Sequence, residues 1–284
     1  MTAFKEMTDS ASRTHKFTVA TAYDTAAVGF DADTRRFFHN CARRLVELTA
    51  LAGAQTVLDL ATGTGAAAFA AASVLPASAH VFGVDLAPKM LAQARRKPAP
   101  SGQPRTTFVQ MDAEWLGFDR ECFDAAVCAF GIFYMPDITS ALREWRRVLR
   151  PAGWVAYSSF GRTAFQPLSD LYEARARHYG SDLPQPTAFA WQRLTSAEAC
   201  RAWLQQADFQ KVQVVVEQHG YYLKDAGDWW QLLWNGSWRQ AIAHLNPEQL
   251  ERFKSEHLAE VQAIATPQGL WLDIEAIFAI GQKP

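Results

Sequence analysis

Short apolar runs alternate with amphipathic segments through the middle of the chain. Between residues 55 and 160 this pattern predicts strands near 56–60, 80–85, 106–110, 124–130 and 153–159. It predicts helices between them near 65–75, 87–97 and 138–149, and a shorter segment near 114–117. Because strand and helix alternate repeatedly, we expect parallel strands wound into one sheet with helices on both of its faces.

Helical patterns flank this region on both sides. Apolar residues at helical spacing from Phe37 to Leu48 predict at least one helix before the first strand, placed to cap a crevice at the sheet. Beyond residue 160, the stretch Gly161–Pro186 is irregular apart from a helix around Leu168–Arg177. Thr195, with Glu198 three positions later, then predicts a capping box that opens the next helix.

The carboxyl-terminal third completes the predicted fold. It contains a sixth strand, two further helical segments and a last strand, at Val212–Glu217, Ala226–Leu245, Pro247–Ala265 and Leu272–Gly281. We expect a single domain, 1–284, in which a helical cap (1–52) precedes the core (53–160) and two insertions on the substrate side follow (161–195 and 223–271).

The nonapeptide at residues 57–65, Val-Leu-Asp-Leu-Ala-Thr-Gly-Thr-Gly, is the most informative segment for chemistry. It predicts a buried strand that opens through a glycine-rich turn into an alanine-rich helix. Gly63 and Gly65 let the backbone approach a ligand closely, because they lack a Cβ. The same turn suits two nucleotide-like cofactors, since Asp85 follows Gly65 by 20 residues, where an acid binds ribose hydroxyls.

The two cofactors differ in charge beside Asp59. A dinucleotide would place its pyrophosphate at this turn, and the carboxylate of Asp59 would repel it. S-adenosylmethionine has no pyrophosphate, and its ammonium group would be attracted to that carboxylate. The strand-end acid therefore favours S-adenosylmethionine, with a nicotinamide or flavin dinucleotide as the alternative.

Composition and charge exclude several classes. The 284 residues carry a net charge of −1 and a pI near 6.7, so nothing indicates binding to nucleic acid or to an anionic membrane. Four cysteines without C-x-x-C spacing indicate buried thiols in a reducing compartment. The longest apolar run, Ala125–Pro136, is too short to span a bilayer, and the amino terminus lacks a secretory pattern. We expect a cytoplasmic protein, a monomer or homodimer, without a membrane span or a metal.

Four sequence motifs follow one another along the chain. They are VLDLATGTG, HVFGVDLAPKMLAQAR, FVQMDAEWLGFDRECFDAAVCAFGIFYMPD and LREWRRVLRPAGWVAYSSF. Together they resemble class I S-adenosylmethionine-dependent methyltransferases, most closely the ubiquinone/menaquinone-biosynthesis C-methyltransferase group (methyltransferase type 11), over roughly residues 50–160. In the first motif Ala61 stands where the wider superfamily usually has glycine, and in the fourth Ala152 separates Pro151 from Gly153.

The resemblance implies a fold and a set of cofactor contacts. The fold is an α/β, Rossmann-like, doubly wound, mostly parallel seven-stranded sheet with an antiparallel last strand and helical lid insertions. Asp85 is expected on the ribose hydroxyls, and Asp112 on the adenine amino group between Met111 and Ala113. The full set of expected cofactor-binding residues is Asp59, Ala61, Thr62, Gly63, Gly65, Asp85, Leu86, Met90, Met111, Asp112, Ala113, Phe130 and Gly131.

Residues that follow the later strands are the candidates for the acceptor side, because ligands of such sheets lie outside the carboxyl ends of the strands. His219 is the first candidate for a general base, and Tyr23 is a second catalytic candidate, since it resembles a Tyr-Asp of the family that often lies over the cofactor. Trp230, Trp234 and Trp238 are expected on one helical face, where core packing is favoured over an acceptor pocket. The candidate substrate residues are Phe133, Tyr134, His178, Tyr222 and Trp234.

The sequence therefore predicts transfer of a methyl group from S-adenosylmethionine, with S-adenosylhomocysteine as product, to a small organic acceptor by in-line displacement. Carbon or oxygen of an aromatic, quinone-like or natural-product molecule is the expected target. Two alternatives stay open. One is a protein that binds S-adenosylmethionine but promotes a non-methylating reaction, and the other is an NAD(P)-dependent oxidoreductase.

Overall fold

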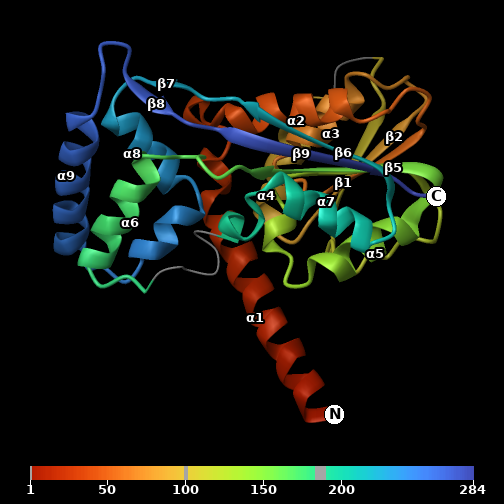
Figure 1. The fold of residues 1–284 in the computed structure, drawn as a ribbon, viewed down its shortest axis with the longest axis horizontal. Coiled ribbons are helices and arrows are strands. Elements are labelled where there is room, and N and C mark those ends of the chain that lie inside the picture. Colours follow the sequence, from red (N-terminus) through yellow and green to blue (C-terminus); the bar gives the residue numbers. More distant parts are fainter. Residues whose placement is uncertain (1, 99–101, 183–189) are drawn as a thin grey trace.

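A seven-stranded sheet forms the centre of the computed structural model, which describes residues 2–98, 102–182 and 190–284. Its strands lie in the order β3-β2-β1-β4-β5-β9-β6 (Figure 1). Their bounds are Thr56–Leu60 (β1), His80–Asp85 (β2), Arg105–Gln110 (β3), Phe123–Ala129 (β4), Leu149–Phe160 (β5), Gln210–Gln218 (β6) and Glu275–Gln282 (β9). The predicted positions of the strands are thus confirmed.

Strand direction agrees with the predicted fold class. Strands β1 to β5 pair in parallel, and β9 inserts antiparallel between β5 and β6. In this register Asp59 of β1 lies opposite Gly83 of β2 and Val127 of β4, so the strand-end acid sits at the middle of the sheet. The sheet is a Rossmann-like, mostly parallel one with an antiparallel last strand, as predicted.

Helices cover both faces of the sheet (Figure 1). Helices α2 (Phe37–Leu48) and α3 (Ala66–Ala72) lie together on one face, while α5 (Ile138–Val148) and α7 (Ala197–Gln206) lie on the other. Helix α4 (Pro88–Arg96) packs along β2 and β3. Alanines at positions 67, 68, 71 and 72 bury one side of α3, and their small side chains let this helix lie close to the strands.

A second group of helices lies beside the sheet, at the left in Figure 1. It consists of α6 (Leu168–His178), α8 (Ala226–Trp234) and α9 (Pro247–Ala263), with the 3₁₀ segment η5 (Ser237–Ile242). The short antiparallel pair of β7 (Tyr221–Leu223) and β8 (Leu270–Leu272), which lie before and after α8, η5 and α9 in the chain, connects this group to the sheet. Aromatic rings hold the group together, because Tyr172 packs edge-on against Trp238 and Phe253.

The predicted long helix at 226–245 is interrupted, and this corrects the tryptophan stripe. Helix α8 ends at Trp234, and Gly236 adopts an extended backbone before η5 begins. Trp230 and Trp234 stack on each other, but Trp238 points into a different environment with Trp229. The three tryptophans therefore do not share one helical face.

Two smaller predictions are also wrong. Ser196, not Thr195, caps α7, because Ser196 has the extended backbone of a cap and its hydroxyl accepts from the amide of Ala199 at 3.1 Å. Residues 114–117 form a turn instead of a helix, since Asp112 and Trp115 pair across it as a β-bridge. Part of the predicted irregular stretch 161–186, and of the insertion 161–195, lies outside the described residues.

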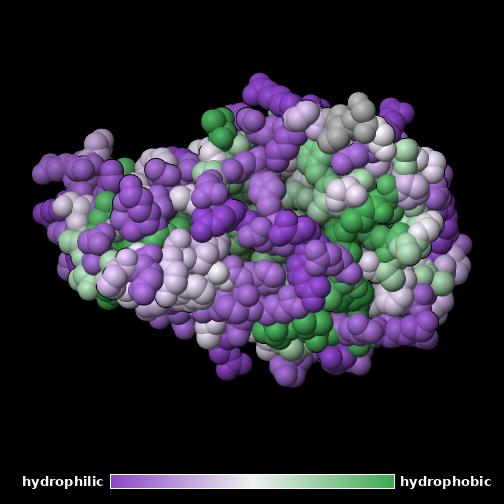
Figure 2. Space-filling model, turned by 90° about the horizontal axis from the view of Figure 1, so that it is seen from above, coloured by the Kyte–Doolittle hydropathy of each residue, from purple (hydrophilic) through white to green (hydrophobic). Residues whose placement is uncertain are grey.

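The amino-terminal helix α1 (Thr2–Ala26) projects from the body, and only its carboxyl-terminal part reaches α4 and η5 (Figure 1). The 3₁₀ segments η1 (Ala27–Gly29) and η2 (Asp33–Arg35) link it to α2, while η3 (Ile132–Tyr134) and η4 (Ala190–Leu194) lie beside each other after β4 and before α7. On the face shown in Figure 2 the surface is mostly hydrophilic, with hydrophobic patches over the half that holds the sheet. Across the described ranges, no helix has the length and apolar character needed to cross a bilayer.

Candidate active site

A pocket opens at the carboxyl ends of β1, β2, β3 and β4, under the last turns of α1. Its floor is the turn that follows β1, and its roof includes Lys16, Val19, Ala20 and Tyr23 of α1. Parallel strands end together at this edge, so side chains far apart in the sequence converge here. The pocket is the first candidate for a ligand site.

Asp59 lies at the bottom of this pocket and is almost wholly buried. Its Oδ2 accepts hydrogen bonds from the Thr62 hydroxyl at 2.5 Å and the Ala68 amide at 2.8 Å. Its Oδ1 is buried with no partner among the described residues. Burial raises the pKa of Asp59 to about 7, although the two hydrogen bonds act in the opposite direction. A buried, half-satisfied carboxylate is suited to bind a cationic group of a ligand.

The turn after β1 has a strained backbone. Gly63 and Gly65 adopt positive φ angles of 55° and 88°, and the non-glycine Ala61 does so too, at 51°. Phe130, which follows β4, has a φ of 55°. A Cβ on Gly131 would lie 2.6 Å from the Cβ of Ala61, so glycine is needed where the turns after β1 and β4 meet. Residues other than glycine seldom adopt a left-handed backbone, and those that do are concentrated at functional sites.

Asp85 ends β2 and fixes this turn from the other side. Its Oδ2 accepts from the amide of Gly63 at 2.7 Å, and its Oδ1 accepts from the amide of Ala87 at 2.8 Å. Burial raises the pKa of Asp85, and these two amides counteract the rise. Each carboxylate oxygen has a second lone pair, so Asp85 can still accept from hydroxyl groups of a ligand.

Lys16 of α1 closes the pocket over the ends of β3 and β4. Its ammonium lies 2.7 Å from Asp112 Oδ2 and 2.6 Å from Glu114 Oε2. The other oxygen of Asp112 accepts from the amide of Glu114 at 2.9 Å. Asp112 is therefore engaged by α1, and this contact ties the amino-terminal helix to the sheet.

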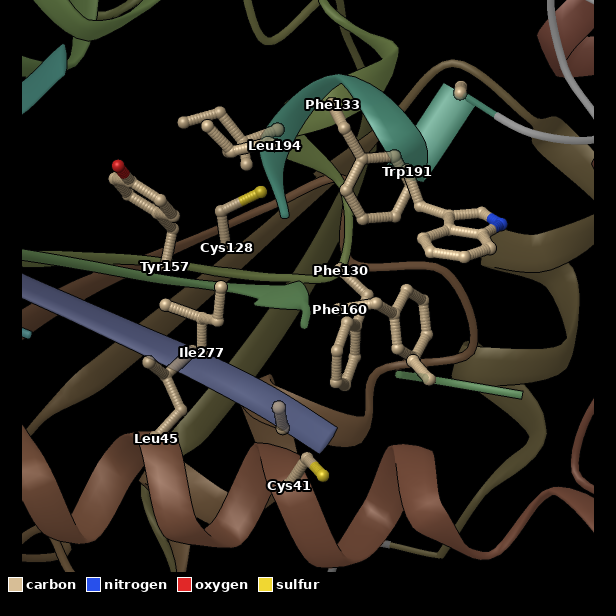
Figure 3. Packing of buried hydrophobic residues seen from close by; sticks show 14 of the residues in the cluster. Cys41, Leu45, Cys128, Phe130, Phe133, Tyr157, Phe160, Trp191, Leu194 and Ile277 are labelled. Atoms are coloured by element: carbon tan, nitrogen blue, oxygen red, sulfur yellow. The ribbon is translucent and has the colours of Figure 1, made fainter. Parts of the chain in front are cut away.

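A second chamber adjoins the first and is lined almost entirely by aromatic side chains. Figure 3 shows Phe130, Phe133, Phe160 and Trp191 gathered where β4 and β5 end. The rings of Phe130 and Phe160 stack with centroids 4.2 Å apart, and Trp191 meets Phe160 edge-on. The remaining lining residues are Tyr23, Arg35, Phe37, Phe38, Tyr134, Phe165, Leu232, Ser237 and Trp238.

The two cavities meet at four side chains. Tyr23, Phe38, Phe130 and Tyr134 line both of them. At this boundary the Tyr23 hydroxyl donates to the Tyr134 hydroxyl oxygen at 2.7 Å, and Tyr134 Oη lies 3.4 Å from Ser237 Oγ. Burial raises the pKa of both phenols, so they stay protonated at neutral pH. Ligands bound in the two cavities would therefore meet at the boundary formed by these phenols.

Comparison with known proteins shows the family of this chain. A protein-family model described as a methyltransferase domain matches residues 57–153. The ubiquinone/menaquinone biosynthesis C-methyltransferase UbiE of Syntrophotalea carbinolica is 38% identical over 160 residues, which cover 55% of this chain and 67% of that protein. The chain belongs to the S-adenosylmethionine-dependent methyltransferases.

Other relatives of this methyltransferase agree in family and fold. The aklanonic acid methyltransferase DauC of a Streptomyces species is 31% identical over 145 residues, 51% of this chain and 66% of that protein. Both alignments thus span about half of this chain and leave about a third of each relative unmatched. A solved structure of a Bacillus halodurans protein named as a methyltransferase has the same fold, with a TM-score of 0.57, 22% identity, and coverage of 86% of this chain and 99% of that one.

The residues of the first cavity fit the cofactor of the methyltransferase family. Asp59 Oδ1, buried and without a partner, matches the ammonium of S-adenosylmethionine. A dinucleotide would bring an anionic pyrophosphate to the same carboxylate, so family membership and local charge agree on the cofactor. The dinucleotide alternative is therefore not favoured.

The structure brings most of the predicted cofactor residues of the methyltransferase together. All of them line the first cavity except Gly65 and Met90. Gly65 begins α3, where a Cβ would lie 2.7 Å from the ring of Phe69. Met90 is fully buried below the cavity and packs with Ala27 and Ala87. Gly65 and Met90 therefore support the wall of the cavity without lining it.

Of the acceptor-side predictions for the methyltransferase, Tyr23, Phe133 and Tyr134 line the aromatic chamber and four others lie elsewhere. The ring of His219 is 3.1 Å from Glu217 Oε2 and packs against Phe278, and His178 is exposed at the end of α6. Tyr222 pairs with Trp271 across β7 and β8, and Trp234 stacks on Trp230. None of these four lines either cavity.

Sequence reasoning missed the residues that reach the site from other elements of the methyltransferase. Lys16 comes from a helix that no periodicity had delimited, and Arg35 comes from a one-turn segment. Trp191 comes from a 3₁₀ segment in the first insertion, whereas Trp238, named in the sequence analysis with core packing favoured, lines the chamber from η5. An isolated basic or aromatic residue in such a segment has no distinguishing pattern, so only the tertiary structure identifies it.

Proposed function

We propose that this chain transfers the methyl group of S-adenosylmethionine to a carbon or an oxygen of a flat, apolar small molecule held in the aromatic chamber. The observation that carries the proposal is the shared boundary of Tyr23, Phe38, Phe130 and Tyr134 between the two cavities. Relatives named for ubiquinone/menaquinone biosynthesis and for aklanonic acid support a quinone-like or natural-product acceptor.

The cofactor residues have distinct proposed tasks. Asp59 holds the ammonium, Asp85 the ribose hydroxyls, and Asp112 with Met111 and Ala113 the adenine. When bound, S-adenosylmethionine would supply an electrophilic methyl carbon on a sulfonium; an acceptor atom bonds to that carbon in line with the carbon–sulfur bond, which breaks to leave S-adenosylhomocysteine. The turn of Ala61, Gly63 and Gly65 and the facing Gly131 bring backbone close enough to fix that group at the chamber boundary.

The chamber residues orient the acceptor and exclude water. Stacked and edge-on rings, such as Phe130 with Phe160 and Trp191, leave a slot that favours a planar molecule. Holding two reactants in such a fixed arrangement can contribute roughly 7–11 kcal/mol to lowering the barrier. We propose that the cap of residues 1–52 and the insertions at 161–195 and 223–271 form the acceptor side, since Tyr23, Trp191 and Trp238 come from them.

The experiment is transfer of a labelled methyl group to a panel of aromatic acids, phenols and quinols, with two variants of one chamber residue. Ser237 is buried and lines the chamber. Ser237→Leu fills the space, and Ser237→Ala is the matched control that enlarges it. We expect Ser237→Leu to lose transfer while its affinity for S-adenosylhomocysteine stays as in the wild type, and Ser237→Ala to keep transfer. Wild-type rates in Ser237→Leu would contradict the assignment of the chamber.

A further inference from the structure

A buried arginine lies in the wall of the aromatic chamber. Arg35 ends the segment η2 and is only 6% exposed. Its guanidinium carbon lies 4.4 Å from the ring centre of Phe30 and 5.0 Å from that of Phe38. A charged group is seldom buried among aromatic rings unless it is paired, because removal from water is costly.

The protein groups around Arg35 do not neutralise it. Nη1 donates to two backbone carbonyls, those of Leu232 at 3.4 Å and of Asn235. Nε is buried and has no partner among the described residues. No carboxylate of the described chain lies within 4.0 Å of the guanidinium. The facing phenols of Tyr23, Tyr134 and Tyr221 are neutral at pH 7.

The acid that contributes to the electrostatic surroundings of Arg35 is already engaged elsewhere. Asp31 contributes to the electrostatic surroundings of Arg35, but it lies 2.9 Å from Lys97 Nζ and accepts from the Thr64 hydroxyl at 2.7 Å. His39 is a further neighbour of Asp31, at 3.6 Å. Burial lowers the pKa of Arg35 to about 10, so the guanidinium still carries its charge at neutral pH. The chamber therefore contains a cation that lacks a counterion.

The backbone makes room for this cation. A Cβ on Gly236 would lie 2.6 Å from Arg35 Nη1, so the guanidinium rests directly against the α-carbon of that glycine. Trp191 adds a second polar group to the same chamber, because its Nε1 is buried and finds no acceptor among the described residues. Two donors without a partner among the described residues, in a chamber lined mostly by aromatic rings, indicate a ligand with acceptor oxygen atoms.

We propose that the methyl acceptor bears an anionic oxygen group, a carboxylate or an ionised phenol or enol, that pairs with Arg35 inside the aromatic chamber. The inference rests on the proposed function and specifies its substrate class: a planar aromatic molecule with one acidic oxygen. Arg35 supplies the counter-charge, and the surrounding rings select the planar body.

Such an acceptor removes the need for a protein base. Among the described residues that line the chamber there is no carboxylate or histidine, and both phenols there are poor bases. An acceptor bound as an anion has already lost its proton. Its oxygen, or the carbon conjugated to it, uses its electron pair to bond the methyl carbon, while the electrons of the broken carbon–sulfur bond remain on sulfur. When a ring carbon of a phenolate is methylated, the proton on that carbon then moves to the ring oxygen, and this restores the aromatic ring.

The loss of charge in this step favours release of the methylated acceptor. The acceptor anion and the sulfonium are consumed together and yield two products without those charges. Arg35 loses its counterion when the methylated acceptor forms, so the product binds less tightly than the acceptor. Arg35 thus acts as a specificity-determining residue for the charged form.

The test compares two probes of the same shape, anthraquinone-2-carboxylate and anthraquinone-2-carboxamide. Each is titrated calorimetrically into the protein saturated with S-adenosylhomocysteine. We expect the carboxylate to bind about tenfold or more tightly than the neutral amide, as for a desolvated, charge-assisted pair. Equal affinities would overturn the proposal for Arg35 and leave the chamber assignment in place. If neither probe binds, the chamber assignment fails as well.

Variants of Arg35 test whether this residue causes the preference for the carboxylate probe. Arg35→Gln should remove the preference for the carboxylate, and Arg35→Lys should keep part of it. Arg36→Gln is the matched control, since Arg36 lies outside the chamber, 3.6 Å from the ring of Tyr221 and 3.0 Å from Asp33, and it should keep the full preference. If Arg35→Gln fails to bind S-adenosylhomocysteine, the wild-type comparison of the two probes still decides. A preference that survives in a folded Arg35→Gln would overturn the proposal.

Discussion

The hydroxyl of Tyr23 donates to the hydroxyl oxygen of Tyr134 at 2.7 Å, and this contact joins α1 to the segment after β4 at the boundary of the two cavities. The two rings also meet edge-on, with centroids 5.4 Å apart. A helix at the amino terminus and a turn 111 residues later thus form one wall of the site.

Replacing Tyr23 with phenylalanine tests this wall. Tyr23→Phe removes the donor but keeps the ring, so we expect kcat/KM for the acceptor to fall about tenfold, the usual scale of one lost buried hydrogen bond. The affinity for S-adenosylhomocysteine should stay unchanged. Tyr157→Phe is the control, because its hydroxyl bonds the carbonyl of Cys200 at 2.7 Å away from both cavities. A similar loss of kcat/KM in the control would contradict a local role for Tyr23.

The affinity for the cofactor product should depend on pH through Asp59. Burial raises the pKa of Asp59 to about 7, so the carboxyl is largely protonated below that pH in the free protein. An ammonium ligand requires the ionised form. We therefore expect S-adenosylhomocysteine to bind more tightly as the pH rises from 5.5 to 7.5, by at most about tenfold per unit. Calorimetry across this range gives the slope.

The variant Asp59→Asn tests this assignment, and the raised pKa also fixes the direction in which Asp59 changes stability with pH. Asp59→Asn keeps an oxygen for Thr62 and Ala68 but loses the charge, so its binding should be weaker and independent of pH in this window. Because folding raises the pKa, the contribution of Asp59 to stability is present below about pH 4 and is lost as the pH rises through 7. A pH-dependent affinity that is unchanged in Asp59→Asn would assign the titration to another group.

The left-handed backbone of Ala61 predicts a stabilising substitution. Its φ of 51° is unfavourable for a residue with a Cβ, and glycine adopts it freely. Ala61→Gly should raise the free energy of unfolding by about 0.5–1 kcal/mol, after the larger entropy of the unfolded chain is subtracted. Denaturant unfolding measures it. Ala129→Gly, in β4 of the same pocket, is the control and should destabilise; equal losses in both variants would exclude backbone strain at Ala61.

Lys16 should control how often α1 opens. Its ammonium bridges Asp112 and Glu114, yet its side chain is partly exposed, so Lys16→Gln should lower the free energy of unfolding by less than about 1 kcal/mol. The larger effect should be local: faster amide hydrogen exchange in the last turns of α1 and several-fold faster release of S-adenosylhomocysteine. Lys89→Gln on α4 is the control. If release is equally fast in wild type and Lys16→Gln, the bridge does not hold the helix closed.

Prediction from the sequence succeeded where the signal is local. The apolar run 57–60, the acid inside it and the glycines at 63 and 65 require no distant partner to specify strand, turn and helix. The positions of Asp85 and Asp112 followed from the rule that parallel strands end at one edge of the sheet. The same rule placed His219 at that edge, but β6 is the outermost strand, three positions from β4, or about 14 Å at the usual strand spacing.

The sequence alone therefore determined the core fold and most of the residues that line the first cavity, because periodicity and turn chemistry act over a few residues. Only the tertiary structure showed which residues line the aromatic chamber. Arg35 lines the chamber together with Trp191 and Trp238, each more than 150 residues further along the chain, and this arrangement depends on how α1, the insertions and the sheet pack together. Packing between distant segments leaves no periodic trace in a single sequence, so the chamber, and the charge inside it, became visible only in the folded chain.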